Sequence, residues 1–269
     1  MKTATPSLAE VSVVRTSSRS RIAASAAAAI VIGVIAWFVV SRVVESRGFP
    51  SPEGVLTALI DTVLGGEFYD DLAVTSRRIV IAWALSMGLG VIWGLVAARS
   101  RIADGLLRPW LLVGLALPSP VATLFAILLL GLAETSAIVG LVLVTAPFVA
   151  NIVFENTVAV PAGLIEMGRA YGFTRRTELL QILLPFLVLA LLASARLALQ
   201  LSWKEVLIME ALARPDGIGE RMTFYFKVLR PDMMVAYTVV FAAGLAAIEF
   251  AVFRPLSRHQ SRWRGRLGD

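Results

Sequence analysis

The sequence contains no cysteine and only one histidine, and both shortages restrict its chemistry. Without cysteine there can be no disulfide and no thiolate metal site. The single histidine, His259, lies in the polar stretch near the C-terminus and outside the long apolar segments of the chain. A membrane-embedded histidine ligand, proton relay or Ser–His pair is therefore excluded. We expect no metal site and no cofactor.

Charge is also scarce. Only 16% of the 269 residues are charged and 58% are hydrophobic, whereas about a quarter of a soluble protein is charged. One water-soluble core could not bury this apolar excess, so part of the solvent must be lipid. The composition predicts an all-α, polytopic membrane protein, because helices satisfy their own backbone hydrogen bonds in lipid.

Six apolar runs are long enough to be membrane helices, since the hydrocarbon core of about 30 Å needs roughly 20 helical residues. They are residues 22–40, 79–98, 110–133, 137–154, 185–201, which could continue toward Met209, and 235–253. The first could instead be a signal peptide, because basic residues precede it. It exceeds the usual apolar length of a signal peptide, and no small-residue cleavage site follows, so we expect an uncleaved helix.

The loop charges predict which way the helices point. Residues 41–76 hold two arginines against six acids, whereas the N-terminal stretch, the 99–109 loop and the C-terminal stretch are rich in arginine. Basic loops stay in the cytoplasm. We therefore expect both termini in the cytoplasm of a cell that carries this chain in its inner (plasma) membrane. This pattern accounts for the net charge of +6 without a nucleic-acid partner.

The loop at 155–185 carries the most specific pattern. Pro161 suits the start of a short helix and Gly172 its C-terminal cap, so we expect a helix over 161–171. Thr174 can cap the helix that follows. Leu164, Met167 and Tyr171 fall on one face of the short helix, while Gly168 and Ala170 keep it thin enough for close approach by a partner.

This loop resembles the EAA loop of permeases of ATP-binding-cassette (ABC) importers. The family pattern is E-A-A-x-x-x-G, nine further residues, then I-x-L-P. Six positions fit its spacing, with a small residue counted in place of the second alanine: Glu166, Gly168, Gly172, Ile182, Leu184 and Pro185. Met167 departs from the first alanine. The stretch from Arg196 to Gly219 and the pair Trp263–Arg264 are also similar to permeases of the nitrate, sulfonate and taurine group.

The resemblance implies the type I importer fold, with a tail at 1–21, a permease domain at 22–253 (core 70–253) and a basic tail at 254–269. It also implies the partners. Two permease copies, most simply a homodimer, form the pathway for a small solute. Two cytoplasmic ATPase subunits dock on the EAA loops, and an external solute-binding protein delivers the solute. A sulfonate, nitrate or related organic anion is the expected substrate.

Several residues in or near the apolar runs are candidates for the pathway: Pro118, Ser119, Pro120, Arg196, Lys204 and Glu210. The two prolines must break the third run, and a break at membrane depth lines either a cavity or a packed interior. A cation such as Arg196 is costly in lipid, so either a passing anion or a permanent acidic neighbour must compensate it. Lys204 and Glu205 could instead mark the outer end of the fifth helix. Glu249 reads as a surface acid that reaches toward the interface.

Two glycines in the second run, at Gly90-x-x-x-Gly94, permit close helix packing, either within the chain or between two copies.

Two other functions remain open on residue patterns alone. A secondary transporter or channel commonly shows inverted repeats or ion-coupling acids within the membrane, and neither is evident. An intramembrane hydrolase needs a nucleophile with a base or two facing carboxylates, which the apolar runs lack. None of the three lysines follows a glycine, so a phosphate-binding loop is absent. We therefore expect that the chain is not an enzyme and that a separate subunit hydrolyses ATP.

Overall fold

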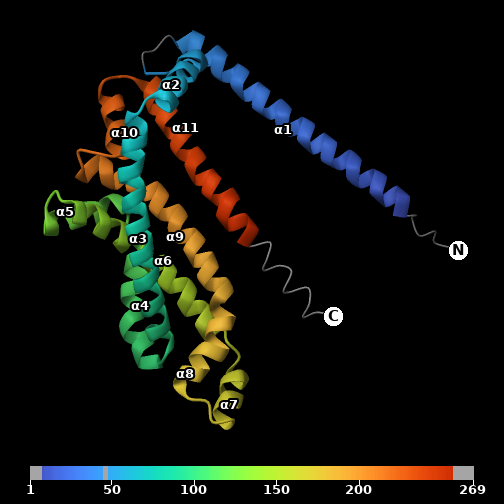
Figure 1. Ribbon diagram of the computed structural model, residues 1–269, viewed down its shortest axis with the longest axis vertical. Coiled ribbons are helices and arrows are strands. Elements are labelled where there is room, and N and C mark those ends of the chain that lie inside the picture. The colour runs from blue at the N-terminus through green and yellow to red at the C-terminus, as the bar shows by residue number, and fades with distance from the viewer. Residues whose placement is uncertain (1–7, 45–47, 257–269) are drawn as a thin grey trace.

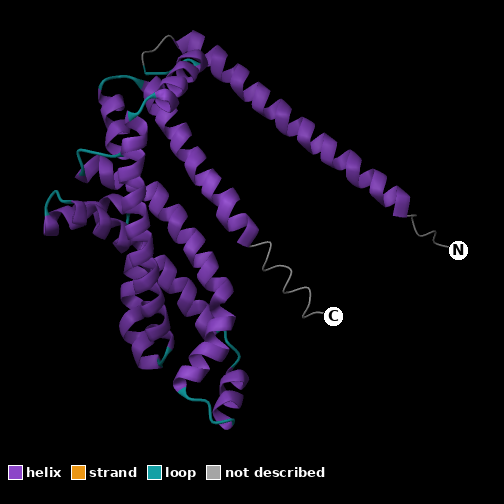
Figure 2. Cartoon of the chain, viewed as in Figure 1, coloured by secondary structure: helices purple, strands orange, loops and turns teal. Residues whose placement is uncertain are grey.

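The computed structural model describes residues 8–44 and 48–256, and within these ranges every regular element is helical (Figures 1 and 2). The helices before the short 161–185 segment are α1 (Leu8–Val44), α2 (Pro52–Leu64), α3 (Glu67–Ala98), α4 (Arg101–Ala116), α5 (Ser119–Leu130) and α6 (Glu134–Val158). The remaining elements are α7 (Ala162–Ala170), α8 (Arg175–Glu178), the π-helical turn η1 (Leu179–Leu183), α9 (Leu184–Ala213), α10 (Ile218–Lys227), α11 (Pro231–Ile248) and the π-helical turn η2 (Glu249–Phe253). The predicted all-α fold is confirmed.

The centre of the bundle is the packing of α3 and α9 against α6. Gly90 and Gly94 of α3 sit so close to α6 that an added Cβ would meet the Ala146 and Ala150 carbonyl oxygens at 2.8 and 2.6 Å. The absence of side chains at these two positions lets the backbones of the two helices approach. The Gly90-x-x-x-Gly94 match therefore serves packing within the chain.

The third apolar run is two helices rather than one. α4 ends at Ala116, α5 begins at Ser119, and the two axes differ by 108°. Pro118 lacks the N–H that would continue α4, and its ring disfavours helical geometry at Leu117, the residue before it, which is extended with ψ 117°. The sequence correctly predicted a break here, and the third run over 110–133 is a sharply bent pair of helices that counts as a single broken span or as two shorter helices.

The fifth helix is longer than expected. α9 continues to Ala213, so Lys204 and Glu205 lie inside it and do not mark its end. Beyond Ala213 a short turn leads into α10, which packs on α9 and α11, and α11 packs on α2. The 202–234 stretch is therefore mostly ordered helix.

The first helix begins at Leu8, earlier than the predicted start at Ile22, and extends away from the bundle (Figure 1). Its described contacts are with the α2 region, where the Trp37 indole N–H donates to the Pro50 carbonyl at 3.0 Å. None of its apolar window from Ala27 to Val44 is buried. Of the predicted C-terminal tail at 254–269, only residues 254–256 are described, and the Trp263–Arg264 pair lies outside the described residues.

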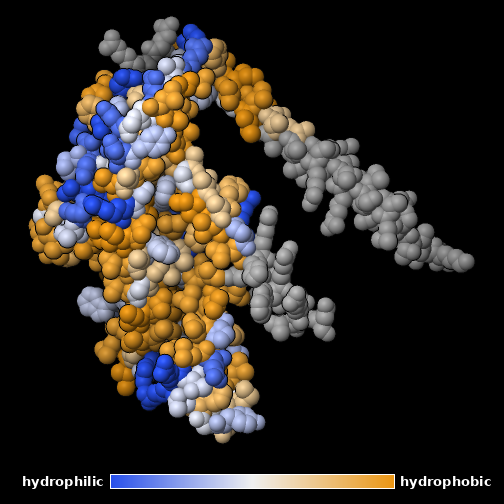
Figure 3. Space-filling view, in the orientation of Figure 1, coloured by the Kyte–Doolittle hydropathy of each residue, from blue (hydrophilic) through white to orange (hydrophobic). Residues whose placement is uncertain are grey.

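Among the described residues, five helices are long and apolar enough to cross a membrane, or six if the bent α4–α5 pair is one span. In the space-filling view a broad apolar region separates hydrophilic groups at the two ends of the bundle (Figure 3). One end carries α2 and α10, and the other carries α7 and α8 (Figure 1).

Candidate functional site: the 161–185 segment and two charged clusters

The short helix α7 ends in a turn that glycine makes possible. Gly172 has φ +77°, the Phe173 N–H donates to the Gly168 carbonyl at 2.9 Å, and the Gly172 N–H donates to the Arg169 carbonyl at 3.0 Å. These two bonds form a Schellman motif, in which a left-handed residue follows the helix. The predicted helix and its glycine cap are confirmed, with Pro161 just before the helix as its N-cap.

The position of Gly168 has no room for a larger residue, because the side chains of Ile182 and Phe173 cover it. A Cβ at this position would lie 2.9 Å from Ile182 Cδ1 and 3.2 Å from the Phe173 ring. α7 is thereby held against η1, and Arg169 and Glu178 add an ion pair at 3.7 Å. Two positions of the sequence pattern, Gly168 and Ile182, are thus in contact in the fold.

The side of α7 next to Gly168 is open to solvent. Leu164, Met167 and Tyr171 have 39%, 50% and 80% of their surface exposed. Glu166 is exposed as well, on another side of the helix about 160° around from Leu164. Within the described residues, no hydrogen bond or ion pair engages Glu166. α7, which lies at the end of the bundle (Figure 1), therefore exposes three apolar side chains and one acid.

Pro185 explains the π-helical turn η1. A proline has no N–H to continue the i to i−4 ladder. Just before it, the Leu184 N–H bonds to the Leu179 carbonyl, five residues back. Thr174 caps α8 as predicted, its hydroxyl accepting from the Thr177 N–H. The segment thus leads into the membrane helix α9 through one π-helical turn, in which the helix is wider than an α-helix.

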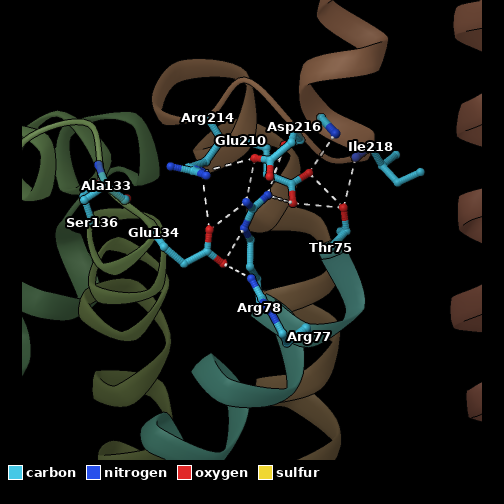
Figure 4. Close-up of polar contacts among 11 residues, drawn as sticks. Thr75, Arg77, Arg78, Ala133, Glu134, Ser136, Glu210, Arg214, Asp216 and Ile218 are labelled. Carbon is cyan, nitrogen blue, oxygen red and sulfur yellow. Dashed lines mark hydrogen bonds and ion pairs between the residues drawn. The ribbon is translucent and has the colours of Figure 1, made fainter. Parts of the chain in front are cut away.

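A second group of polar residues, the Arg78 cluster, joins α3, α6, α9 and the loop before α10 (Figure 4). Its members are Thr75, Arg78, Glu134, Glu210, Arg214 and Asp216. The Arg78 side chain is fully buried and donates to Glu134, Glu210 and Asp216 at 2.7 to 3.0 Å. A further bond to the Asp216 carbonyl brings its bonds to five, the number of N–H groups on a guanidinium.

Glu210 is equally enclosed. Its carboxylate accepts from Arg78, from the Thr75 hydroxyl at 2.9 Å and from the Gly219 N–H at 2.9 Å. Gly217, at φ +100°, leaves room for it, because a Cβ there would lie 2.5 Å from the Glu210 carboxyl carbon. These contacts explain why the chain has glycine at 217, and they hold α10 against α9.

Asp216 lies in the loop outside the spans. Desolvation raises the pKa of Asp216, but hydrogen bonds and charge from Arg78 and Arg214 outweigh it and hold the pKa below its ordinary value. A carboxyl with a lowered pKa contributes stability above its unfolded pKa of about 3.9 and loses it only as the pH falls through the lower folded value. The Asp216 contacts therefore persist at neutral pH.

A third feature is an ion pair between α9 and η2. Arg196 donates through Nε and Nη2 to the two carboxylate oxygens of Glu249, and Gln200 Nε2 lies 3.5 Å from Glu249 Oε2. The interpretation of Glu249 as a surface acid reaching for the interface is therefore wrong. A permanent acidic neighbour compensates Arg196, so this arginine does not by itself require a passing anion.

The six pathway candidates do not form one site. Pro118, Ser119 and Pro120 lie at the α4–α5 break, Glu210 lies in the Arg78 cluster, and Arg196 pairs with η2. Lys204 is exposed on α9. Sequence reasoning missed Arg78, because it stands beside Arg77 just before an apolar run and looks like an ordinary flanking charge. Glu134 likewise looked like a lone turn residue.

The chain matches the family model "binding-protein-dependent transport system inner membrane component" over residues 89–258, more than half of its length. It belongs to this family of ABC importer permeases. The predicted family is confirmed, and so is its helical membrane fold. Permeases of this family work with a separate ATPase and a binding protein.

Curated relatives of the permease are distant but cover most of it. A protein of Brucella melitensis named as a probable ABC transporter permease is 25% identical over 80% of this chain and 87% of its own length. SsuC of Escherichia coli, named for aliphatic sulfonates transport, is 29% identical over 78% of this chain and 81% of its own length. SsuC of Bacillus subtilis is 25% identical over 82% and 80%.

A solved structure supports the same fold. In an inward-facing form of the MetNI methionine ABC transporter, one chain is 21% identical, with a TM-score of 0.58 over 72% of this permease and 94% of that chain. At this identity the likeness concerns the fold alone. The structural neighbour and the family together identify the type I importer permease architecture.

Proposed function

We propose that this permease couples to its ATPase through α7 and, as one of two identical copies, forms the translocation pathway for a small solute. The observation that carries the coupling is the exposure of α7, which has an apolar face formed by Leu164, Met167 and Tyr171 and an exposed acid, Glu166, on another side. An apolar face that the described residues leave exposed, held at the end of the bundle, is suited to a pocket on another protein.

The mounting of α7 also favours this role. α7 is tied to the start of α9 through Gly168, Ile182 and the Arg169–Glu178 pair, and α9 runs through the bundle to the Arg78 cluster. A displacement of α7 by a partner would therefore be transmitted to a long membrane helix rather than lost in a flexible loop. Residues Leu184 and Pro185, at the joint, belong to the same proposed coupling segment as Glu166, Met167, Gly168, Gly172 and Ile182.

Charge reversal of Glu166 tests the coupling surface. We expect Glu166→Lys to leave the permease inserted and folded, because this exposed side chain has no described polar contact, and to lower the yield of co-purified ATPase subunit by at least about tenfold, or ~1.4 kcal/mol. Asp61→Lys is the matched control, since Asp61 is an exposed acid on α2 at the other end of the bundle. Equal ATPase recovery with Glu166→Lys and wild type would refute the assignment of α7.

The orientation has its own test. The arginine-rich α3–α4 turn favours a cytoplasmic position for that end of the bundle, which also carries α7, and the acidic 41–76 loop favours an outside position for α2. Because the chain has no cysteine, single cysteines carry no background. We expect Ile60→Cys on α2 to react with an impermeant thiol reagent in intact cells and Asp104→Cys on α4 to react only after permeabilisation. Reversed labelling would overturn the orientation.

For the substrate we propose a small organic anion such as a sulfonate, delivered by an external binding protein to the end that carries α2 and α10. The support is the pair of sulfonate permeases among the relatives. The broken α4–α5 pair, with Pro118, Ser119 and Pro120 at its joint, is suited to lining such a pathway, because non-helical backbone at membrane depth is stable beside water or buried in protein.

A further inference from the structure

Arg78 and Arg196 both pair with acids, but they differ in how many of their N–H donors those pairs use. Arg78 donates hydrogen bonds through all five of its N–H groups, to three carboxylates and one carbonyl, and its side chain has no exposed surface. Arg196 makes two bonds, both to Glu249, and 47% of its side chain is exposed. No other hydrogen bond from Arg196 occurs in the described chain. Arg196 thus keeps up to three free donors.

The position of Arg196 makes these free donors unusual. The face of α9 that packs into the bundle carries Ala190, Ser194, Ala198 and Ser202, all buried. Arg196 is two residues beyond Ser194, about 200° around the helix, and so points away from that packing. It is also well inside α9, 12 residues after Leu184 and 17 before Ala213. A half-exposed guanidinium at this depth would be costly against lipid, so this face adjoins water or protein.

The side chains around Arg196 form a small polar site. Glu249 fixes the guanidinium through two bonds, and Gln200, one turn further along α9, adds an amide. Glu249 opens the π-helical turn η2, and Pro255 soon follows it. Turns of this kind occur often at functional sites, because the widened backbone re-aims a side chain.

We infer that Arg196, oriented by Glu249 and assisted by Gln200, is a contact point for an anionic group of the solute inside the translocation pathway. The free edge of the guanidinium suits the oxygens of a sulfonate or carboxylate, which a planar fork binds through two hydrogen bonds. Glu249 already neutralises one unit of charge, so the added anion is held weakly. A transported solute needs such weak holding, because it must leave the site as readily as it enters.

This inference rests on the proposed function, since it assumes a pathway, but its test needs neither the ATPase nor a known solute. Ala193 is exposed on α9 one turn before Arg196, and residues three apart share a helix face. In the otherwise cysteine-free chain, Ala193→Cys reports on water and charge beside Arg196. The full-length chain in nanodiscs is treated with an anionic methanethiosulfonate (ethylsulfonate) and a cationic one (ethyltrimethylammonium), and each rate is divided by its rate with 2-mercaptoethanol.

We expect both reagents to react with Ala193→Cys. The normalised rate of the anionic reagent should be about ten times that of the cationic one, a ratio that corresponds to ~1.4 kcal/mol. Adding Arg196→Gln should bring the ratio to about one or below. Millimolar ethanesulfonate should slow labelling of Ala193→Cys alone and not of the Arg196→Gln double variant. Glu249→Gln should raise the ratio further, because it removes the competing acid.

Three results would overturn the inference. No labelling by either reagent would mean that lipid or protein covers this face. An anion-to-cation ratio unchanged by Arg196→Gln would mean that the arginine does not set the local potential. Should Arg196→Gln fail to fold, as judged by size-exclusion elution, Glu249→Gln decides alone, and an unchanged or lower ratio counts against the site. A failure of ATPase docking at α7 would leave all of these rates unchanged, so the two proposals fail separately.

Discussion

Replacement of Arg78 by lysine is expected to destabilise the folded permease by about 3 kcal/mol or more, the usual cost of leaving a buried carboxylate without its partner. Lysine keeps the charge but offers three donors on a single nitrogen in place of a five-donor fork. It could not reach Glu134, Glu210 and Asp216 together, as Arg78 does. The fully buried Glu210 would then be only partly compensated.

The measurement is the temperature at which the detergent-solubilised protein loses its monodisperse elution profile. Arg77→Lys is the matched control, because the neighbouring Arg77 is 63% exposed and, among the described residues, pairs with Glu134 alone. We expect the control to change stability by less than about 1 kcal/mol, as surface pairs do. Equal loss in the two variants, or none in Arg78→Lys, would show that the Arg78 cluster does not hold the four segments together.

Replacement of Gly172 by valine is expected to uncouple the permease from its ATPase. From the sequence alone a bulky side chain at Gly172 is expected to clash where the chain turns, but nothing lies within 4 Å of a Cβ added there, so that expectation is wrong. The cost comes from the backbone, because φ is +77° and a left-handed residue with a side chain costs about 1–2 kcal/mol, more when it is β-branched. Relief of this strain would open the Schellman turn and redirect the exposed face of α7.

The readout is ATP hydrolysis by the assembled complex, which we expect to fall by at least about fivefold in Gly172→Val. Gly172→Asn should keep most of the activity, since asparagine tolerates the left-handed region. Gly105→Val supplies the control for a valine at an open glycine, because Gly105 lies in α4 with nothing near its Cβ position. If valine and asparagine at 172 behave alike, the turn geometry is not what coupling requires.

The parts of the fold that depend on local patterns were predictable. Long uncharged runs predicted the membrane helices, and Gly172 and Thr174 predicted the caps around α7 and α8 because capping is decided within a few residues. The ends of α9 and the angle between α4 and α5 were not predictable. They depend on neighbours such as α10 and α6, which no short window contains.

The charged contacts show the same limit more sharply. Arg78 meets Glu134 and Glu210 across 56 and 132 residues of chain, and nothing around Arg78 distinguishes it from Arg77. Arg196 was recognised as unusual from its apolar surroundings alone, but its partner Glu249 lies 53 residues away. A sequence can show that a membrane charge needs compensation, while only the fold identifies the group that supplies it.

The central claim, ATP-driven import coupled through α7, is tested most directly by solute accumulation in proteoliposomes that contain the permease, its ATPase and its binding protein. With ethanesulfonate as the solute, we predict accumulation that requires ATP on the side of α7 and the binding protein on the side of α2. It should survive dissipation of ion gradients and disappear with Glu166→Lys. Accumulation driven by an ion gradient without ATP, unaffected by Glu166→Lys, would contradict the claim.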